Sequence, residues 1–234
     1  MAERRAPPEP EIRAMFDGLV EHYDQVNDVL SVGLDRSWRR TTRRALAARR
    51  GDRILDLGCG TGDLGRPLAD LATVVGVDLS HPMLLRARAK CGTRSRSMRR
   101  ATFVEGNAMA LPFSTGAFDG ALSGFVLRNL RDLDAAFDEL ARVVRAGGRV
   151  ALVDITGPTR PFLRRGFDAV FSTLAPLAGR AVGREREYRY LVGSLAHLPP
   201  VPELRAKLER AGFADVRARP LTGGVVTLLT GTRR

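Results

Sequence analysis

The hydrophobic positions of the chain fall into short continuous runs, separated by longer stretches in which they recur every three or four residues. The continuous runs predict strands and the recurring positions predict helices. Strands are expected at residues 53–57, 73–77, 102–105, 118–123 and 149–155, and near Val216 and Val225–Leu229. Because strands and helices alternate, we predict an α/β fold with a mostly parallel seven-stranded sheet and helices on both faces.

The predicted helices connect these strands and also precede them. They run over about Ile12–Leu30, Trp38–Arg49, Gly62–Leu71, His81–Lys90, Asp132–Gly147 and Glu203–Ala211. The helix after Asp132 has the clearest signal, because its apolar residues share one face. Asp132 is its expected N-cap, and Gly147-Gly148 are expected to end it.

Two segments do not follow this alternation. Residues 1–10 are charged and rich in proline, so we predict a disordered leader, followed by a single domain over residues 11–234. Residues 157–200 are too long for an ordinary connection between elements, so we predict a helical insertion that forms a lid over the active site.

Composition excludes several classes of protein. The sequence is 44% hydrophobic, enough for a substantial core, yet it holds no uncharged apolar stretch near the roughly 20 residues of a membrane span. The N-terminus lacks the apolar segment of a signal peptide. Its two cysteines lack the spacing of a metal site, so we expect no metal, no disulfide and a cytoplasmic location.

The chain is strongly basic, with 38 Lys and Arg against 26 Asp and Glu and a net charge of +12. Arginines cluster at residues 39–50 and 94–100. Such a surface can attract nucleic acid or anionic lipid headgroups. Arginine used in place of lysine also fits a bias in nucleotide composition, and we leave both explanations open. Nucleic-acid binding is disfavoured, because no RNA- or DNA-reading motif accompanies the charge.

The strongest motif is the loop Asp56-Leu57-Gly58-Cys59-Gly60-Thr61-Gly62, directly after an apolar strand. Its glycines permit positive φ and let backbone amides approach a ligand closely. The spacing is GxGxG, whereas a dinucleotide-binding loop has GxGxxG. We interpret Cys59 as a small loop residue, since no histidine lies nearby in the sequence to activate a thiol.

A second acid, Asp78, ends the second predicted strand and is followed by Leu79. A carboxylate at that position can accept hydrogen bonds from both ribose hydroxyl groups of a nucleoside cofactor. Gly106-Asn107-Ala108 follows the third predicted strand. Ligands of α/β proteins bind at the carboxyl ends of parallel strands, so these sites predict one nucleoside-binding region.

The flanking motifs resemble those of the ubiquinone/menaquinone biosynthesis C-methyltransferase family. The matching residues are Met15-Phe16-Asp17, Tyr23-Asp24, Asn27, Ser31, Gly33, Trp38-Arg39, Leu127-Arg128-Asn129, Arg142-Val143, Gly147-Gly148-Arg149, Tyr188-Arg189-Tyr190-Leu191, Ala211-Gly212-Phe213, Leu221-Thr222 and Gly224-Val225-Val226. The resemblance extends from about Met15 to Gly231. It implies a Rossmann-like class I methyltransferase that uses S-adenosylmethionine.

The resemblance also implies a set of cofactor-binding residues. In that family the first acid, here Asp56, helps to hold the methionine ammonium, and the residues after the third strand contact adenine. Asn107 departs from the usual aspartate there but keeps an amide that donates and accepts hydrogen bonds. The complete predicted set is Asp56, Gly58, Gly60, Thr61, Gly62, Asp78, Leu79, Asn107 and Ala108.

Arg128, Asn129 and Tyr23 are the predicted catalytic residues. The implied reaction methylates the ring carbon of a prenylated quinol, most simply demethylmenaquinol. That carbon becomes nucleophilic when a neighbouring hydroxyl group loses its proton, and Arg128 could stabilise the resulting oxyanion. Its high pKa makes Arg128 a poor direct base. His22 and His197 are weaker candidates for titrating groups.

The predicted lid combines apolar residues such as Phe162, Phe167 and Phe171 with arginines such as Arg164 and Arg180. It could admit a lipid quinol at the inner face of an anionic membrane, or pack on its own domain or on a second subunit of a homodimer. Two other functions remain open. One is methylation, at carbon or oxygen, of another small aromatic acceptor. The other is nucleic-acid binding without catalysis.

Overall fold

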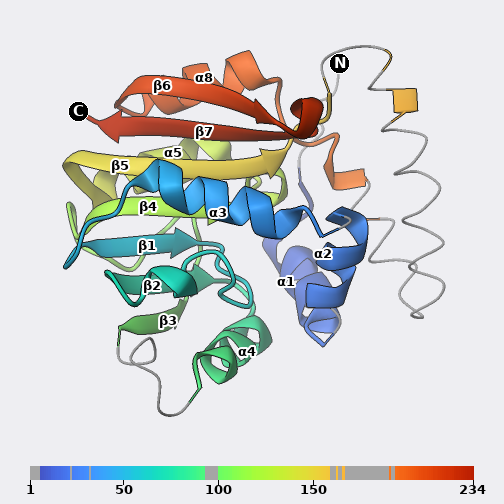
Figure 1. Ribbon diagram of the computed structural model, residues 1–234, viewed down its shortest axis with the longest axis horizontal. Coiled ribbons are helices and arrows are strands. Elements are labelled where there is room, and N and C mark those ends of the chain that lie inside the picture. The colour runs from blue at the N-terminus through green and yellow to red at the C-terminus, as the bar shows by residue number, and fades with distance from the viewer. Residues whose placement is uncertain are drawn as a thin grey trace.

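A single mixed sheet forms the centre of the protein, for which the computed structural model describes residues 6–21, 23–31, 33–92, 100–158, 162, 165–166, 190 and 193–234. Its strands are β1 (Arg53–Leu57), β2 (Thr73–Asp78), β3 (Ala101–Glu105), β4 (Phe118–Gly124), β5 (Val144–Ile155), β6 (Phe213–Leu221) and β7 (Val226–Arg233). Their order is β3-β2-β1-β4-β5-β7-β6, and β7 runs antiparallel to the other six described strands (Figure 1). The predicted mostly parallel seven-stranded sheet is confirmed.

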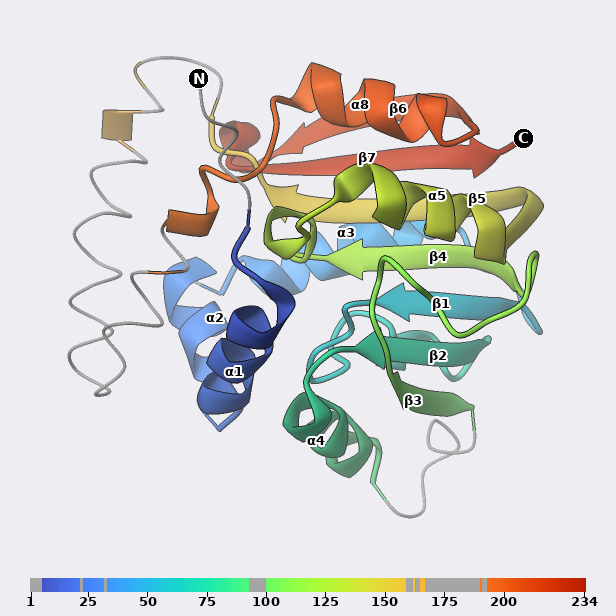
Figure 2. The ribbon, with the colours of Figure 1, turned by 180° about the vertical axis from the view of Figure 1, so that it is seen from behind.

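Helices cover both faces of this sheet. They are α1 (Glu9–Leu19), α2 (Tyr23–Ser31), α3 (Asp35–Leu46), α4 (His81–Cys91), α5 (Leu133–Val143) and α8 (Val201–Arg210). Helix α3 crosses one face in contact with β4 and β5, while α5 and α8 lie on the other (Figures 1 and 2). Helices α1 and α2 lie beyond the carboxyl ends of the parallel strands (Figure 1).

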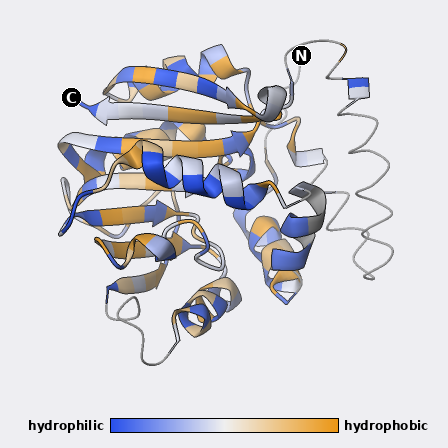
Figure 3. Ribbon diagram, viewed as in Figure 1, coloured by the Kyte–Doolittle hydropathy of each residue, from blue (hydrophilic) through white to orange (hydrophobic). Residues whose placement is uncertain are grey.

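The core is buried on both sides of the sheet. Ile54 packs into the cluster beneath α3, whereas the next residue, Leu55, packs into the cluster beneath α5 and α8. Successive residues of a strand point to opposite faces, so a strand covered on both faces is apolar throughout. Figure 3 shows this pattern in the central strands, beside a largely hydrophilic α3. That helix buries only a narrow stripe that includes Trp38 and Leu46.

The segment after the glycine loop is not the predicted helix. Residues of Gly62–Leu71 form turns around a short 3-10 helix, η1 (Arg66–Leu68). Gly62 has a φ of +80°, which a helix cannot contain. The backbone N–H of Gly65 donates to the carboxylate of Asp56 at 2.8 Å instead of to a helical carbonyl. Pro67 has no N–H group to continue a helical ladder.

Three predicted boundaries also differ. The single helix expected over Ile12–Leu30 is two helices, α1 and α2, separated by a turn at Val20 and Glu21. Helix α5 ends at Val143, and β5 begins at once with Val144, so the predicted end at Gly147 is wrong. Helix α1 starts at Glu9, inside the predicted leader. The predicted N-cap is confirmed, because Asp132 accepts a hydrogen bond from the N–H of Ala135 at 3.0 Å.

Most of the predicted lid lies outside the described residues. Of the aromatic residues that we assigned to it, Phe162 is described and is 86% exposed, whereas Phe167 and Phe171 are not described. The basic loop from Arg94 to Arg99 and His22 also lie outside the described part of the chain.

Candidate active site

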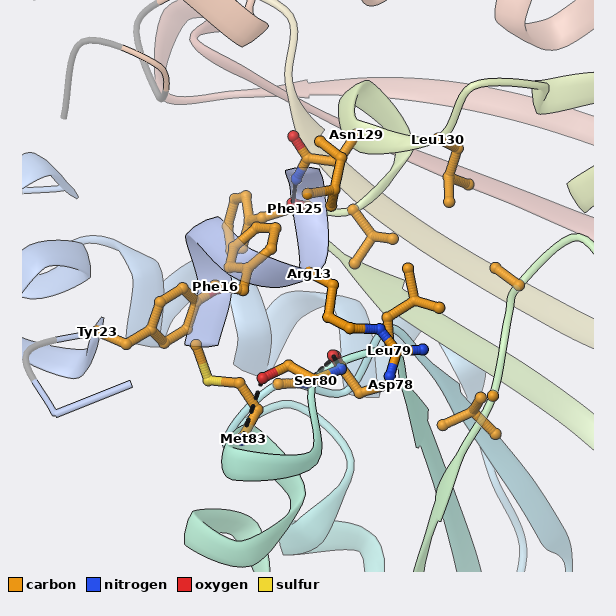
Figure 4. Close-up of a pocket in the computed structure, with 17 residues that line it drawn as sticks. Arg13, Phe16, Tyr23, Asp78, Leu79, Ser80, Met83, Phe125, Asn129 and Leu130 are labelled. Carbon is orange, nitrogen blue, oxygen red and sulfur yellow. Dashed lines mark hydrogen bonds between the residues drawn. The ribbon is translucent and has the colours of Figure 1, made fainter. Parts of the chain in front are cut away.

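A cavity that is open to solvent lies at the carboxyl ends of the parallel strands (Figure 4). The predicted residues that line it are Tyr23, Gly58, Gly60, Asp78, Leu79, Ala108 and Asn129. They come from the N-terminal helices and from the segments after β1, β2, β3 and β4. The segments after these strands thus share one cavity, at the place where ligands of α/β proteins bind.

The glycine loop forms the floor of the cavity. Gly58 and Gly60 have φ values of +64° and +51°, a region that residues with a Cβ rarely adopt. At Gly58 a Cβ would also overlap the side chain of Val126, which lines the same cavity. The N–H of Cys59 donates to the carbonyl of Val77 at 2.9 Å, which ties the loop to β2. Both glycines therefore expose backbone atoms, without a side chain, to the cavity.

Asp78 connects this loop to the end of β2. Its Oδ2 accepts the N–H of Gly60 at 2.7 Å, and its Oδ1 accepts the N–H of Ser80 at 3.0 Å. Burial raises the pKa of Asp78, while these backbone hydrogen bonds lower it. Each carboxylate oxygen has further acceptor capacity, so the residue can still bind hydroxyl groups in the cavity.

Asp56 lies beneath the loop, is 1% exposed and does not itself line the cavity. Its Oδ2 accepts the N–H of Gly65, whereas its Oδ1 has no hydrogen-bond partner among the described residues. Burial raises the pKa of Asp56 to about 7. A buried carboxylate oxygen without a partner is unfavourable unless a cation or donor reaches it.

Three of the predicted residues turn their polar groups or surfaces away from the cavity. The hydroxyl of Thr61 donates to Asp24 at 2.9 Å and accepts from Lys90 at 2.8 Å. Gly62 packs toward Ala87 and Phe103 below the loop. Asn107 donates from Nδ2 to Glu9 at 2.6 Å, and its Oδ1 accepts the N–H of Met109 at 2.8 Å. The structure thus gives Thr61 and Asn107 roles in holding the surrounding elements.

Arg128 is buried next to the cavity and does not line it. Its guanidinium group forms an ion pair with Asp154 at the end of β5, and its Nε donates to Ser194 at 3.2 Å. Asp154 is 2% exposed and also accepts the N–H of Ile155 at 2.7 Å. The positive charge that we assigned to catalysis is therefore balanced by a buried carboxylate.

Asn129 and Tyr23 do line the cavity. The hydroxyl of Tyr190 donates to Oδ1 of Asn129 at 3.2 Å, and Nδ2 of Asn129 donates to the carbonyl of Phe125 at 3.5 Å. Burial raises the pKa of Tyr23, and it raises that of Tyr190 to about 12. Both phenols consequently remain protonated hydrogen-bond donors near neutral pH.

The aromatic and basic part of the cavity wall was largely missed by the sequence-based site prediction. Phe16 contacts Tyr23 edge to face, with ring centroids 6.2 Å apart, and Phe125 lies near them (Figure 4). Ile12 and Arg13 extend this wall from α1. Phe125 follows β4, so the strand-end rule could have identified it. Nothing in the local pattern places α1 over the cavity.

Among the described residues, no group of three or more His, Cys, Asp or Glu side chains could hold a metal ion. Within the same residues, none of the helices has the length and hydrophobicity that crossing a bilayer requires.

Known methyltransferases resemble this chain in sequence and in fold. Residues 4–233 match the ubiE/COQ5 methyltransferase family. The chain is 39% identical over 227 residues to a demethylmenaquinone methyltransferase of Roseiflexus castenholzii, covering 95% of this chain and 93% of the relative. Its fold resembles an S-adenosylmethionine-dependent methyltransferase of Thermotoga maritima, with a TM-score of 0.65 and 19% identity over 95% of this chain and 99% of that one.

A second solved structure with this fold contains the cofactor. It is phosphoethanolamine N-methyltransferase 2 of Haemonchus contortus in complex with S-adenosyl-L-methionine. The match has a TM-score of 0.63 and 16% identity, and it covers 84% of this chain and 52% of that chain. At this level of identity the likeness establishes the shared fold.

Proposed function

Because the chain belongs to the ubiE/COQ5 methyltransferase family, we propose that it methylates a ring carbon of a prenylated quinol, with demethylmenaquinol as the substrate and menaquinol as the product. As a member of this family it is an S-adenosylmethionine-dependent C-methyltransferase. One observation carries the proposal: a single cavity joins the glycine loop and Asp78 to an aromatic wall of Phe16, Tyr23 and Phe125. A nucleoside cofactor and an aromatic acceptor can meet there.

The residues at one end of the cavity fit S-adenosylmethionine. The carboxylate of Asp78 can accept the ribose hydroxyl groups, and Leu79 and Ala108 offer apolar surface to a planar base. Asp56 does not line the cavity, so its unpartnered Oδ1 would hold the methionine ammonium through a bridging water. When bound, S-adenosylmethionine supplies an electrophilic methyl group on a positively charged sulfur.

The other end of the cavity fits an aromatic acceptor. Phe16, Tyr23 and Phe125 can hold a flat ring by edge and face contacts and exclude water from it. Such positioning aligns the reacting carbon with the methyl group and accounts for much of the rate enhancement expected of a methyl transfer.

Polar groups in this wall and behind it can stabilise the quinol oxyanion. Tyr23 and Asn129 line the cavity and carry hydrogen-bond donors. Arg128 directly precedes Asn129 in the sequence, and the ion pair with Asp154 fixes the position of its guanidinium group. In this arrangement Tyr23 and Asn129 orient the hydroxyl group, while the positive charge of Arg128 favours its ionised form.

The proposal is tested by incubating the purified protein with S-adenosylmethionine and either a short-chain demethylmenaquinol or the matching oxidised quinone. Mass spectrometry should detect transfer of one methyl group to the quinol and none to the quinone, because only the quinol ring carbon is an activated nucleophile. The Asp78→Ala variant is the control for transfer that does not depend on the cofactor site.

A protein that binds the cofactor but leaves demethylmenaquinol unchanged would contradict the assigned substrate. A panel of benzoquinols and other phenols would then identify the acceptor class. The unusual Asn107 is no argument for a different acceptor. Its side chain contacts Glu9 and Met109 and does not line the cavity.

Peripheral association with an anionic membrane is part of the same proposal, since the substrate carries a prenyl tail. The net charge of +12 and the exposed Phe162 support it. Sedimentation with vesicles tests it: binding to vesicles that contain an anionic lipid should weaken as salt rises. Equal partitioning onto neutral and anionic vesicles would contradict it.

A further inference from the structure

One face of helix α1 is joined to the carboxyl ends of β2 and β3 by three polar contacts. They link Glu9 to Asn107 at 2.6 Å, Arg13 to Glu105 at 2.5 Å and Asp17 to Ser80 at 2.5 Å. The three residues of α1 are spaced four apart in the sequence, so they lie on the same side of the helix. Helix α1 is thereby held across the end of the cavity where the nucleoside part of the cofactor fits.

Arg13 is the member of this face that enters the cavity. Its side chain extends from α1 toward Asp78 and Leu79 (Figure 4). Gly106 and Ala108 line the same end from the loop after β3. The planar guanidinium group therefore lies among the residues that the cofactor's adenosine would contact.

The chemistry of this position suits a planar base. Guanidinium groups stack on aromatic rings and on nucleic-acid bases, and such contacts combine dispersion with cation–π attraction. Glu105 balances the charge of Arg13, so the pair adds no net positive charge to a site for a cationic cofactor. The side chains of both residues are 39% exposed, so water reaches the pair and the contact can open.

We infer that Arg13 is a cofactor-binding residue whose guanidinium group stacks on the adenine of S-adenosylmethionine, and that the contacts of Glu9, Arg13 and Asp17 keep α1 closed over it. The inference rests on the proposed function for the identity of the ligand. It also explains the amide at residue 107. Asn107 can donate to Glu9, whereas an aspartate there would place two carboxylates together.

Isothermal calorimetry and stopped-flow displacement with S-adenosylhomocysteine test this inference. Arg13→Ala should weaken binding about 10-fold and speed dissociation, as expected for loss of one stacking contact to a base. Arg13→Lys should recover only part of this loss, because the ammonium can pair with Glu105 but has no plane to stack. Arg36→Ala is the matched control, since Arg36 also pairs with a carboxylate, that of Asp28, and is 76% exposed outside the cavity.

Hydrogen exchange of α1 gives a second measurement. In the parent protein, S-adenosylhomocysteine should slow exchange of the amides in residues 9–19, and Arg13→Ala should reduce this protection. The melting temperature of ligand-free Arg13→Ala should stay close to that of Arg36→Ala. Glu105→Gln should weaken binding less than Arg13→Ala, because the guanidinium group remains.

Binding by Arg13→Ala that is as tight as the parent's, or tighter, would overturn the inference. A second pair of results would also overturn it: Arg13→Lys binds as tightly as the parent, and Glu105→Gln loses as much affinity as Arg13→Ala. The ion pair would then account for the whole effect, without any stacking. A parent protein that binds S-adenosylhomocysteine with these variant effects but methylates no quinol would overturn the proposed function and leave the role of Arg13 intact.

Discussion

The carboxylate of Asp78 accepts the backbone N–H of Gly60 at 2.7 Å, so the acid at the end of β2 also shapes the glycine loop after β1. Its second oxygen accepts the N–H of Ser80, at the start of α4. One side chain therefore positions two backbone segments of the cavity and offers acceptors to a ribose. A substitution at Asp78 affects both functions together.

Asp78→Ala should accordingly weaken S-adenosylhomocysteine binding by about 10- to 100-fold, the effect of losing hydrogen bonds to a charged acceptor. Its melting temperature should also fall, because two partly buried N–H groups lose their acceptor. Asp119→Ala is the matched control. Asp119 accepts the N–H of Arg53 at 2.7 Å at the opposite end of the sheet. Asp119→Ala should lose stability without losing affinity for S-adenosylhomocysteine. If calorimetry finds equal affinity for Asp78→Ala and the parent, Asp78 is not part of the binding site.

Gly58→Ala should abolish cofactor binding and lower stability. The new Cβ would occupy a positive φ and overlap Val126, and each effect typically costs about 1–3 kcal/mol. Gly51→Ala separates the two effects, because Gly51 has a φ of +92° and no atom beyond its own chain neighbours lies within 4 Å of the position that its Cβ would take. It should lose only the backbone contribution to the free energy of unfolding. Adding Val126→Ala to Gly58→Ala should recover part of the stability, and no recovery would contradict the overlap.

The buried Asp56 predicts two opposite dependences on pH. Its pKa is raised from 3.8 to about 7, so folding favours the protonated acid. This contribution to stability is complete below about pH 4 and is lost as the pH rises toward 7. Binding of a ligand ammonium requires the carboxylate, so cofactor affinity should instead rise through about pH 7.

The Asp56→Asn variant tests both dependences. The melting temperature of the parent relative to Asp56→Asn should fall between pH 5 and pH 8, while the affinity of the parent for S-adenosylhomocysteine should rise and that of Asp56→Asn should stay nearly constant. Calorimetry in buffers of different ionisation enthalpy should detect proton release on binding below pH 7. Parallel pH profiles for the two proteins would contradict a role for Asp56 in holding the ammonium.

The central strands and the glycine loop could be predicted because their signals are local. Ile54 and Leu55 lie on opposite faces of β1 and are both buried, which produces a continuous apolar run that ends at the loop. Asp78 is detectable for the same reason, since it directly follows the run of β2. A ligand site at the ends of such strands follows from the topology.

The remaining features depend on contacts between distant residues. Glu9 reaches Asn107 across 98 positions, and Thr61 reaches Asp24 across 37. Apolar spacing and motif residues carry no information on such partners. The prediction of a helix after Gly62 was wrong for a related reason, because the backbone N–H of Gly65 donates to Asp56 of the preceding strand.

The buried pairing of Arg128 with Asp154 determines how a catalytic role of Arg128 must be tested. Arg128→Ala leaves the Asp154 carboxylate buried and uncompensated, which typically costs about 3–5 kcal/mol of stability. A loss of activity in that variant would therefore have two explanations. The double variant Arg128→Gln with Asp154→Asn removes both charges and keeps two side chains that can hydrogen-bond to each other.

We expect the double variant to recover most of the melting temperature that Arg128→Ala loses, while its kcat stays about 10²- to 10³-fold below the parent's, as for loss of an oxyanion-stabilising group. Its affinity for S-adenosylhomocysteine should match the parent's, because Arg128 does not line the cavity. Arg128→Lys with Asp154 retained should show intermediate kcat, since the charge remains but the planar group is lost. A stable double variant with near-parental kcat would show that the pair is structural, and the stabilisation of the quinol oxyanion would then fall to Tyr23 and Asn129.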